Sequence, residues 1–513
     1  MLRIINYFDK LLFTDHGFSS LTPLLSKAER SVLSRKIGVE ITMQFYEALN
    51  EIMKKHNIKA IDICRECGLK RPYLSKIMSG NLTPSSYEIV ERIINSIDMT
   101  IAEKELLTDS YQMSVSSEAD KILWKSFQQA YSLSLPSNLQ TSPVETFSLA
   151  NGAVIAAPLR LDAVAKRILN GASDNVGIFF SAISVGVSER LSHCLSEMPA
   201  ETSIKWIMPL NGDKSGNDMN FTLMINAFTM FCARPVKVLK REENVPLLLN
   251  NPFPFYIITD KELLIFDENF EMGQYFNDTG IVRLYRENFS KRSKETTPFL
   301  GSFDRAEPVL KYLSEEMFSM EKDPENVYYT VSNVPCIIFD ISTSDVHKYT
   351  VEQNEQSHDF ANMYLNFIAN VAKTSNQVVD IFSMYGLLDY LDNDEWYELG
   401  RHFSKSISKD FRRQMVKSSM NYAKVSQNSR LHALKIPGFN NNAFIGVNIW
   451  TSGYMIFLYD FDEKPVVITA KDRGIAGSMI SYIKKLHKHG IIASQEETAS
   501  YIDKLLTERM ADG

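Results

Sequence analysis

The chain has 513 residues, of which 44% are hydrophobic and 23% charged, and its formal net charge is −7. A chain of this length is several times longer than one small binding module, so most of it must fold into further domains with cores of their own. The sequence has no run of about 18 apolar residues that could cross a bilayer, and its N-terminus lacks the pattern of a secretory signal. We therefore expect a cytoplasmic protein with no membrane partner.

Residues 1–38 are rich in apolar side chains and are predicted to form a helical extension. Basic residues outnumber acidic ones in the same segment. Two roles therefore stay open for it: an arm that lies over DNA phosphates, and a helix that packs or dimerises.

Residues 39–113 are predicted to form an all-α domain, because apolar residues recur at helical spacing in short blocks. One helix is predicted over Ala60–Cys67. Gly68 follows it, at a position where a helix end favours a residue that accepts left-handed backbone. The next helix is predicted over Arg71–Ser79. The pattern is therefore a helix, a tight glycine turn and a second helix.

The apolar residues, turn glycines and loop proline of this segment share one register: Ile63, Cys64, Cys67, Gly68, Leu69, Leu74, Ser75, Ile77, Gly80 and Pro84. In this register the segment resembles the helix-turn-helix of the Cro and C1 repressors, the XRE family. The resemblance implies a domain that binds double-stranded DNA. Its second motif helix would enter the major groove, with N-terminal residues facing the base edges.

The resemblance implies DNA-binding residues along the second motif helix and the loop after it. These are Lys70, Arg71, Pro72, Tyr73, Ser75, Lys76 and Asn81. Arg71 is the strongest candidate, because a guanidinium can form two hydrogen bonds to guanine. By position, Lys76 can reach a base or a phosphate, while Lys70 and Tyr73 can reach the DNA backbone.

Two departures from the family pattern limit the expected sequence readout. Lys59 and Ala60 stand where the family often has Thr-Gln, and Pro72 offers no hydrogen bond to a base. The negative net charge is offset locally, because the acidic residue Glu66 stands alone among the basic residues between Arg65 and Leu82. We expect DNA binding to depend on one small face.

The chain has five cysteines, which are too few and too scattered for a disulfide framework, as in a reducing compartment. Cys64 and Cys67 have a spacing that can mark a zinc or redox site. No second pair of Cys or His residues lies nearby in the sequence, and both positions are apolar core positions of the family. We therefore assign no metal and no cofactor.

Residues 114–149 are predicted to contain a helix, over Ala119–Leu133, and a linker. The linker, Ser134–Thr146, is rich in Pro and Ser and has little periodicity. A new domain is expected to begin near residue 150.

From residue 150 onward, short β-branched and aromatic runs alternate with amphipathic helices, which predicts an α/β or α+β region. The segments Phe255–Arg292 and Gly446–Leu486 both place a hairpin before a helix. We therefore predict two diverged copies of one unit, in residues 150–300 and 301–513. The whole chain is expected to be multidomain, with an all-α N-terminal domain and a larger α/β region.

The order of elements in the first copy is similar to one half of a phospholipase D-like domain. That superfamily carries its chemistry on a His-x-Lys motif and a downstream Asp. The corresponding positions here are Phe253, Phe255 and Asp260, so only the acid is present. The sequence also lacks a phosphate-binding loop, a Ser nucleophile elbow and a His-Glu-x-x-His helix. We therefore assign no catalytic residue and do not expect an enzyme.

Two hypotheses of function follow. In the leading one, the protein is a sequence-specific transcriptional regulator, and the α/β region forms a homodimer and senses a small-molecule or peptide effector. In the alternative, the protein is an enzyme or defence factor that uses the helix-turn-helix only for docking. A deep pocket with converging His, Lys or carboxylate groups would favour the alternative, and an apolar pocket or a flat dimer face would favour the regulator.

Overall fold

The computed structural model describes residues 43–116, residues 149–303 with short gaps, and, beyond these, mainly 325–336, 374–392, 405–435 and 443–511. The predicted extension over residues 1–38 and the linker Ser134–Thr146 lie outside the described residues. Of the helix predicted over Ala119–Leu133, only residues 120, 121 and 124 are described, and they are helical.

The N-terminal domain, residues 43–116, is all-helical. Its helices are α3 (Phe45–Lys55), α4 (Ala60–Cys67), α5 (Arg71–Met78), α6 (Tyr87–Asn95) and α7 (Ile101–Val115). The bounds of α4 and α5 agree with the predicted ones to within a residue. Gly68 ends α4 in left-handed backbone, with φ of 64°, and the chain turns at once into α5. The domain has a core that includes the fully buried Leu49, Leu74 and Ile93.

The first unit, residues 149–300, is built on a mixed sheet. Its strands are β1 (Val154–Ile155), β2 (Asn175–Phe179), β3 (Ser203–Asn211), β4 (Lys237–Glu243), β5 (Phe255–Ile258), β6 (Leu263–Phe266) and β7 (Gly273–Phe276). Strands β2, β3 and β4 are parallel neighbours, whereas β5, β6 and β7 form an antiparallel meander that joins the sheet at β2. The helices are α9 (Pro158–Asn170), α10 (Val185–Ser196), α12 (Val245–Leu248) and α13 (Thr279–Lys294).

The second unit, residues 301–511, has a sheet of the same kind. Its strands are β9 (Val327–Ser332), β10 (Gln377–Ser383), β11 (Ser429–Leu434), β12 (Ala443–Trp450), β13 (Gly453–Asp460) and β14 (Val466–Ala470). Strands β9, β10 and β11 are parallel, and β12, β13 and β14 form an antiparallel meander that joins the sheet at β9. The helices are α17 (Met384–Asp392), α18 (Lys409–Val425), α19 (Arg473–Lys488) and α20 (Gln495–Ala511).

The two units therefore share strand order and strand direction. In the first unit, Ile178 pairs with Trp206 on one side and with Ile257 on the other. In the second unit, Thr330 occupies the same place between its two neighbours, Asp380 and Asn448. A long helix, α13 or α19, follows the meander in each unit. Because both sheets mix parallel and antiparallel strands, the region is α+β.

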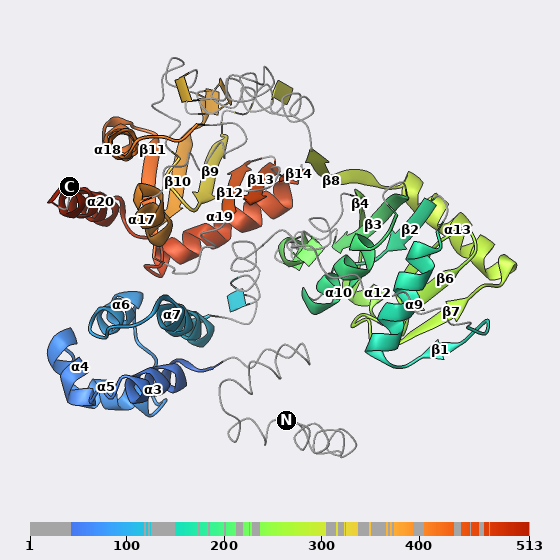
Figure 1. Ribbon diagram of the computed structural model, residues 1–513, viewed down its shortest axis with the longest axis horizontal. Helices are drawn as coiled ribbons and strands as arrows, with labels where there is room; N and C mark the ends of the chain where they lie inside the picture. The colour runs from blue at the N-terminus through green and yellow to red at the C-terminus, as the bar shows by residue number, and fades with distance from the viewer. Residues whose placement is uncertain are drawn as a thin grey trace.

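One strand, β8 (Thr297–Phe303), connects the two units and pairs with both sheets. Its first part pairs with β4, and its last part, residues 301–303, pairs with β14. The strands thus follow one another in a single order from β1 to β11, and the units stand head to tail (Figure 1). The predicted boundary between residues 300 and 301 falls inside this strand.

Of the helices that the structure describes, none combines the length and apolar character that a membrane span requires.

Candidate nucleic-acid interface

Helix α5 has a buried side and an exposed side. Leu74 and Ile77 are fully buried on the side that packs into the N-terminal domain, and Asn50 of α3 donates a hydrogen bond of 2.8 Å to the carbonyl of Met78 at the end of the helix. Arg71 and Lys76 lie exposed on the other side. The buried residues therefore fix the direction in which the basic residues point.

The basic residues of this exposed side have no acidic partner in the part of the chain that the structure describes. Among the residues that the structure describes, none forms an ion pair with Lys70, Arg71 or Lys76. Arg65 of α4 differs, because its guanidinium lies 3.2 Å from Asp62 and 3.5 Å from Glu66. Within the described residues, no acidic side chain therefore neutralises the positive charge of α5.

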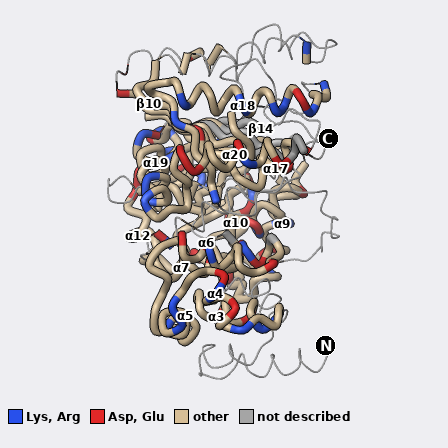
Figure 2. Tube along the Cα trace, turned by 90° about the vertical axis from the view of Figure 1, so that its left-hand side faces the viewer, with Lys and Arg blue, Asp and Glu red and all other residues tan. Residues whose placement is uncertain are grey.

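Helix α5 lies at the end of the N-terminal domain that is farther from the second unit. Helices α6 and α7 lie between α5 and the second unit, and α3, α4 and α5 form the outer end of the molecule (Figure 1). Figure 2 shows the same arrangement from the side, with basic positions on α5 at this outer end. Within the described part of the chain, the approach to α5 is open.

Pro72 and Ser75 are exposed with Arg71 on α5, whereas Tyr73 is half-buried. The Tyr73 hydroxyl accepts a hydrogen bond of 3.3 Å from the backbone N–H of Ser85 and lies 3.5 Å from the Ser85 hydroxyl. Tyr73 therefore anchors the loop that follows α5, a role that the sequence did not indicate because the partner lies beyond the motif.

Asn81 lies exposed just after α5. Its amide donates a hydrogen bond of 2.9 Å to the Ser79 hydroxyl, which in turn donates to the carbonyl of Lys76. This chain of bonds caps the helix end and places Asn81 beside Lys76. The structure thus brings the seven predicted residues together on α5 and its flanking turns.

The two N-terminal cysteines belong to the core of the N-terminal domain. Cys67 is buried, and its thiol donates a hydrogen bond of 3.2 Å to the carbonyl of Arg92. Burial raises the pKa of the Cys67 thiol above its ordinary value. Cys64 packs half-buried against the same core. The environment of both residues is that of packing side chains.

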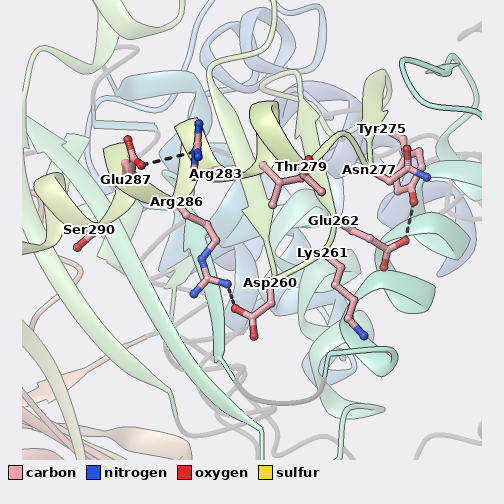
Figure 3. Close-up of a pocket in the computed structure, with 11 residues that line it drawn as sticks. Asp260, Lys261, Glu262, Tyr275, Asn277, Thr279, Arg283, Arg286, Glu287 and Ser290 are labelled. Atoms are coloured by element: carbon pink, nitrogen blue, oxygen red, sulfur yellow. Dashed lines mark hydrogen bonds and ion pairs between the residues drawn. The ribbon is translucent and has the colours of Figure 1, made fainter.

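A cleft of about 860 Å³ lies in the first unit, beside the hairpin between β5 and β6 and the start of α13 (Figure 3). It is lined mainly by polar and charged side chains: Asp260, Lys261, Glu262, Tyr275, Asn277, Thr279, Val282, Arg283, Arg286, Glu287 and Ser290. The cleft is open to solvent and mixes both signs of charge.

Two carboxylates of this cleft are held by arginines. Asp260 forms an ion pair with Arg286. Glu262 lies 2.7 Å from Arg167 and accepts a hydrogen bond of 2.6 Å from the Tyr275 hydroxyl. Burial, followed by the bond to Glu262, raises the pKa of Tyr275. Both acids therefore have a structural partner in the hairpin region.

The other positions compared with the phospholipase D-like motif are Phe253 and Phe255. Phe255 is fully buried in β5, and Phe253 lies half-buried in the loop before that strand. Both positions are apolar. Of the three compared positions, only Asp260 therefore has an ionisable side chain, and that side chain forms an ion pair with Arg286.

A buried acid of the second unit was not singled out from the sequence. Asp380 lies in β10 and is 3% exposed. Its carboxylate accepts hydrogen bonds from the Thr330 hydroxyl and, at 2.8 Å, from the backbone N–H of Cys336. Burial raises the pKa of Asp380 to about 6. An acid inside the apolar run Gln377–Ser383 is the signal that could have indicated it.

No protein-family model matches the chain, and no curated protein sequence matches it. Similar solved structures include the archaeal chromatin protein TrmBL2, described as showing a novel mode of DNA binding; it is 11% identical, with a TM-score of 0.19, and the match covers 53% of this chain and 100% of that one. Another is phosphatidylserine synthase of Haemophilus influenzae Rd KW20, 8% identical with a TM-score of 0.23, covering 69% of this chain and 91% of that one. At such TM-scores neither likeness supports an argument about fold or function.

Proposed function

We propose that this chain is a sequence-specific DNA-binding regulator of transcription and that α5 is its reading helix. One observation carries the proposal. Lys70, Arg71 and Lys76 lie exposed at the start and on the outer side of a helix that follows a glycine turn, without an acidic partner among the described residues. This is the arrangement expected of a helix that enters a major groove lined by phosphates.

In the proposed complex, the side chains of α5 have different tasks. Arg71 stands at the first position of the helix, where its guanidinium reaches the base edges and can bond both O6 and N7 of guanine. Lys70 precedes the helix and contacts a phosphate, as does Lys76 when it does not reach a base. Phosphate contacts set the position of the helix, and Arg71 supplies the discrimination between bases.

We also propose that the chain acts as a homodimer, and that its α+β region joins the two copies and responds to a small-molecule or peptide effector. One helix-turn-helix holds DNA weakly, and a second copy on an adjacent half-site roughly doubles the contacts. Sedimentation with and without DNA tests the dimer. A chain that remains monomeric on DNA would contradict this part of the proposal.

The two α+β units are, we propose, diverged copies of one ancestral unit. Their common strand order and strand directions support this origin. The cleft of the first unit does not favour the alternative function, an enzyme or defence factor, because the cleft is open to solvent, whereas a catalytic pocket encloses a few convergent groups. Its acids Asp260 and Glu262 are engaged with Arg286 and Arg167.

The experiment that tests the DNA reader is selection of bound sequences from a pool of randomised duplexes. We expect Arg71→Ala to lose preference for guanine at one position of each half-site, a cost of about 1–3 kcal/mol. Arg65→Ala is the matched control, because Arg65 is engaged with acids of its own helix. Equal sequence preference in the wild type and Arg71→Ala would refute the role of Arg71.

A further inference from the structure

The N-terminal domain is fastened to the second unit through α6. The Tyr87 hydroxyl donates a hydrogen bond of 3.3 Å to the backbone carbonyl of Lys435. The ammonium of the same lysine donates to Glu91 at 2.9 Å. Tyr87 and Glu91 lie one helical turn apart, so α6 forms hydrogen bonds with both the backbone and the side chain of Lys435.

Lys435 contacts both the N-terminal domain and the second unit. It directly follows β11, and its backbone N–H bonds to the carbonyl of Ile491 at 3.0 Å. Its side chain is 11% exposed and lies 3.5 Å from a second acid, Glu497, near the start of α20. A nearly buried ammonium between carboxylates of two domains is costly to separate from either one, because the remaining charges lose their partner.

Two further features make this contact a junction between domains. Asp120, beyond the end of α7, lies 2.5 Å from Lys485 of α19. The apolar core is also continuous across the contact, since Tyr87, Ile491 and Ile492 belong to one cluster of buried residues. Ionic and apolar contacts thus meet at the same end of the second unit.

The N-terminal domain contacts the end of β11 and not the outer edge of the sheet. That edge is taken by residues 491–493, which form the bridge between Leu434 and Ile492, and by α20, which packs against β11. Lys435 lies where the strand ends, one residue beyond the bridge. The N-terminal domain therefore docks where β11 meets residues 491–493.

We propose that Glu91, Lys435 and Glu497 form a latch through which the second unit and the DNA reader influence each other. Helix α5 faces the DNA from the outer side of the N-terminal domain, and α6 holds the inner side of the same domain to β11. A displacement at the end of β11 then moves the domain that carries α5. The link to DNA rests on the function proposed above, whereas the latch itself does not.

The first measurement is hydrogen exchange of the full-length chain without DNA. We expect Lys435→Met and Glu91→Gln to speed exchange of the amides of α6 about fivefold, the factor that a coupling of about 1 kcal/mol gives. Lys424→Met is the control, because Lys424 pairs at 3.7 Å with Asp503 inside the second unit. Glu91→Gln removes only a charge and keeps the test valid if Lys435→Met does not fold. Unchanged exchange in Glu91→Gln would overturn the latch.

The second measurement adds a mixed-sequence duplex of about 30 base pairs at low salt, where sequence-independent binding is strong. We expect DNA to slow exchange in residues 429–435 of the wild type and to have no such effect in Glu91→Gln. If DNA binds and residues 429–435 do not respond in the wild type, the latch does not transmit. If the wild type does not bind the duplex, the proposed function fails, and the first measurement still decides whether the latch exists.

Discussion

Lys70 stands at the N-cap of α5 with its side chain in solvent, and in the proposed complex its ammonium contacts a phosphate. We expect Lys70→Ala to weaken binding to all duplexes alike and to lower the slope of log K against log salt by about 0.9, the loss of one phosphate contact. Fluorescence anisotropy at several salt concentrations measures the slope. Lys104→Ala in α7 serves as the control, and a loss confined to one DNA sequence would assign Lys70 to a base instead.

Asp380 shows how burial makes a residue sensitive to pH. Its pKa is about 6 in the folded chain and about 3.9 in an unfolded one. The folded state therefore holds the proton more tightly, so stability is greatest at low pH and declines as pH rises through 6. From pH 5 to pH 8 this residue alone is expected to lower the free energy of unfolding by about 1 kcal/mol.

The variant Asp380→Asn tests this expectation. Its amide can still accept the N–H of Cys336 and can donate to the Thr330 hydroxyl, while the buried charge is absent. We expect the variant to fold and to lose less stability than the wild type between pH 5 and pH 8 in thermal unfolding. Parallel pH dependence of the two proteins would mean that Asp380 does not titrate in this range.

At the scale of the helix and turn, two glycines of the N-terminal domain have different reasons to be glycine. Gly68 has φ of 64° with nothing within 4 Å of an added Cβ, whereas at Gly80, with φ of 75°, the Cβ would lie 3.0 Å from the Tyr46 ring. We expect Gly68→Ala to cost about 1 kcal/mol, from backbone strain alone, and Gly80→Ala to cost more. Urea unfolding measures both.

The control for the two glycine variants is a third glycine at which alanine is expected to raise stability. Gly477 lies exposed in α19, and an added Cβ there meets nothing within 4 Å. Gly477→Ala should therefore stabilise the chain by up to about 1 kcal/mol, since alanine has the higher helix propensity. Equal costs at Gly68 and Gly80 would show that Tyr46 moves aside.

The helices α4 and α5 could be predicted because their signals are local: apolar spacing, the glycine turn and Pro72 in the first turn of α5. The strands β5 and β6 were visible for the same reason. Contacts between residues that are distant in the chain could not be predicted. The sequence does not indicate that Ser85 binds Tyr73, or that Glu91 binds a residue 344 positions away. Such contacts depend on how whole elements pack.

At the scale of the whole molecule, two hairpin-and-helix segments led to the prediction of a repeated unit, which stays a prediction, and they did not indicate how the two sheets join. Which strands are neighbours depends on pairings between distant parts of the chain, and local periodicity does not encode them. The sequence therefore indicated a boundary at residues 300 and 301, where the structure has the middle of β8. The buried Asp380 was missed for a related reason, because its partner Thr330 lies on another strand.

Because β8 belongs to both sheets, the alternation of its side chains between the two faces links the orientation of one sheet to that of the other. Successive residues of a strand point to opposite faces, so an insertion of one residue after Leu300 would reverse the phase of the second sheet relative to the first, whereas two residues would restore it. We expect the single insertion to lower the unfolding temperature by several degrees more than the double one. If β8 acted only as a linker, the double insertion would lower the unfolding temperature as much as the single one, or more. We therefore expect β8 to tolerate insertions of an even number of residues better than insertions of an odd number.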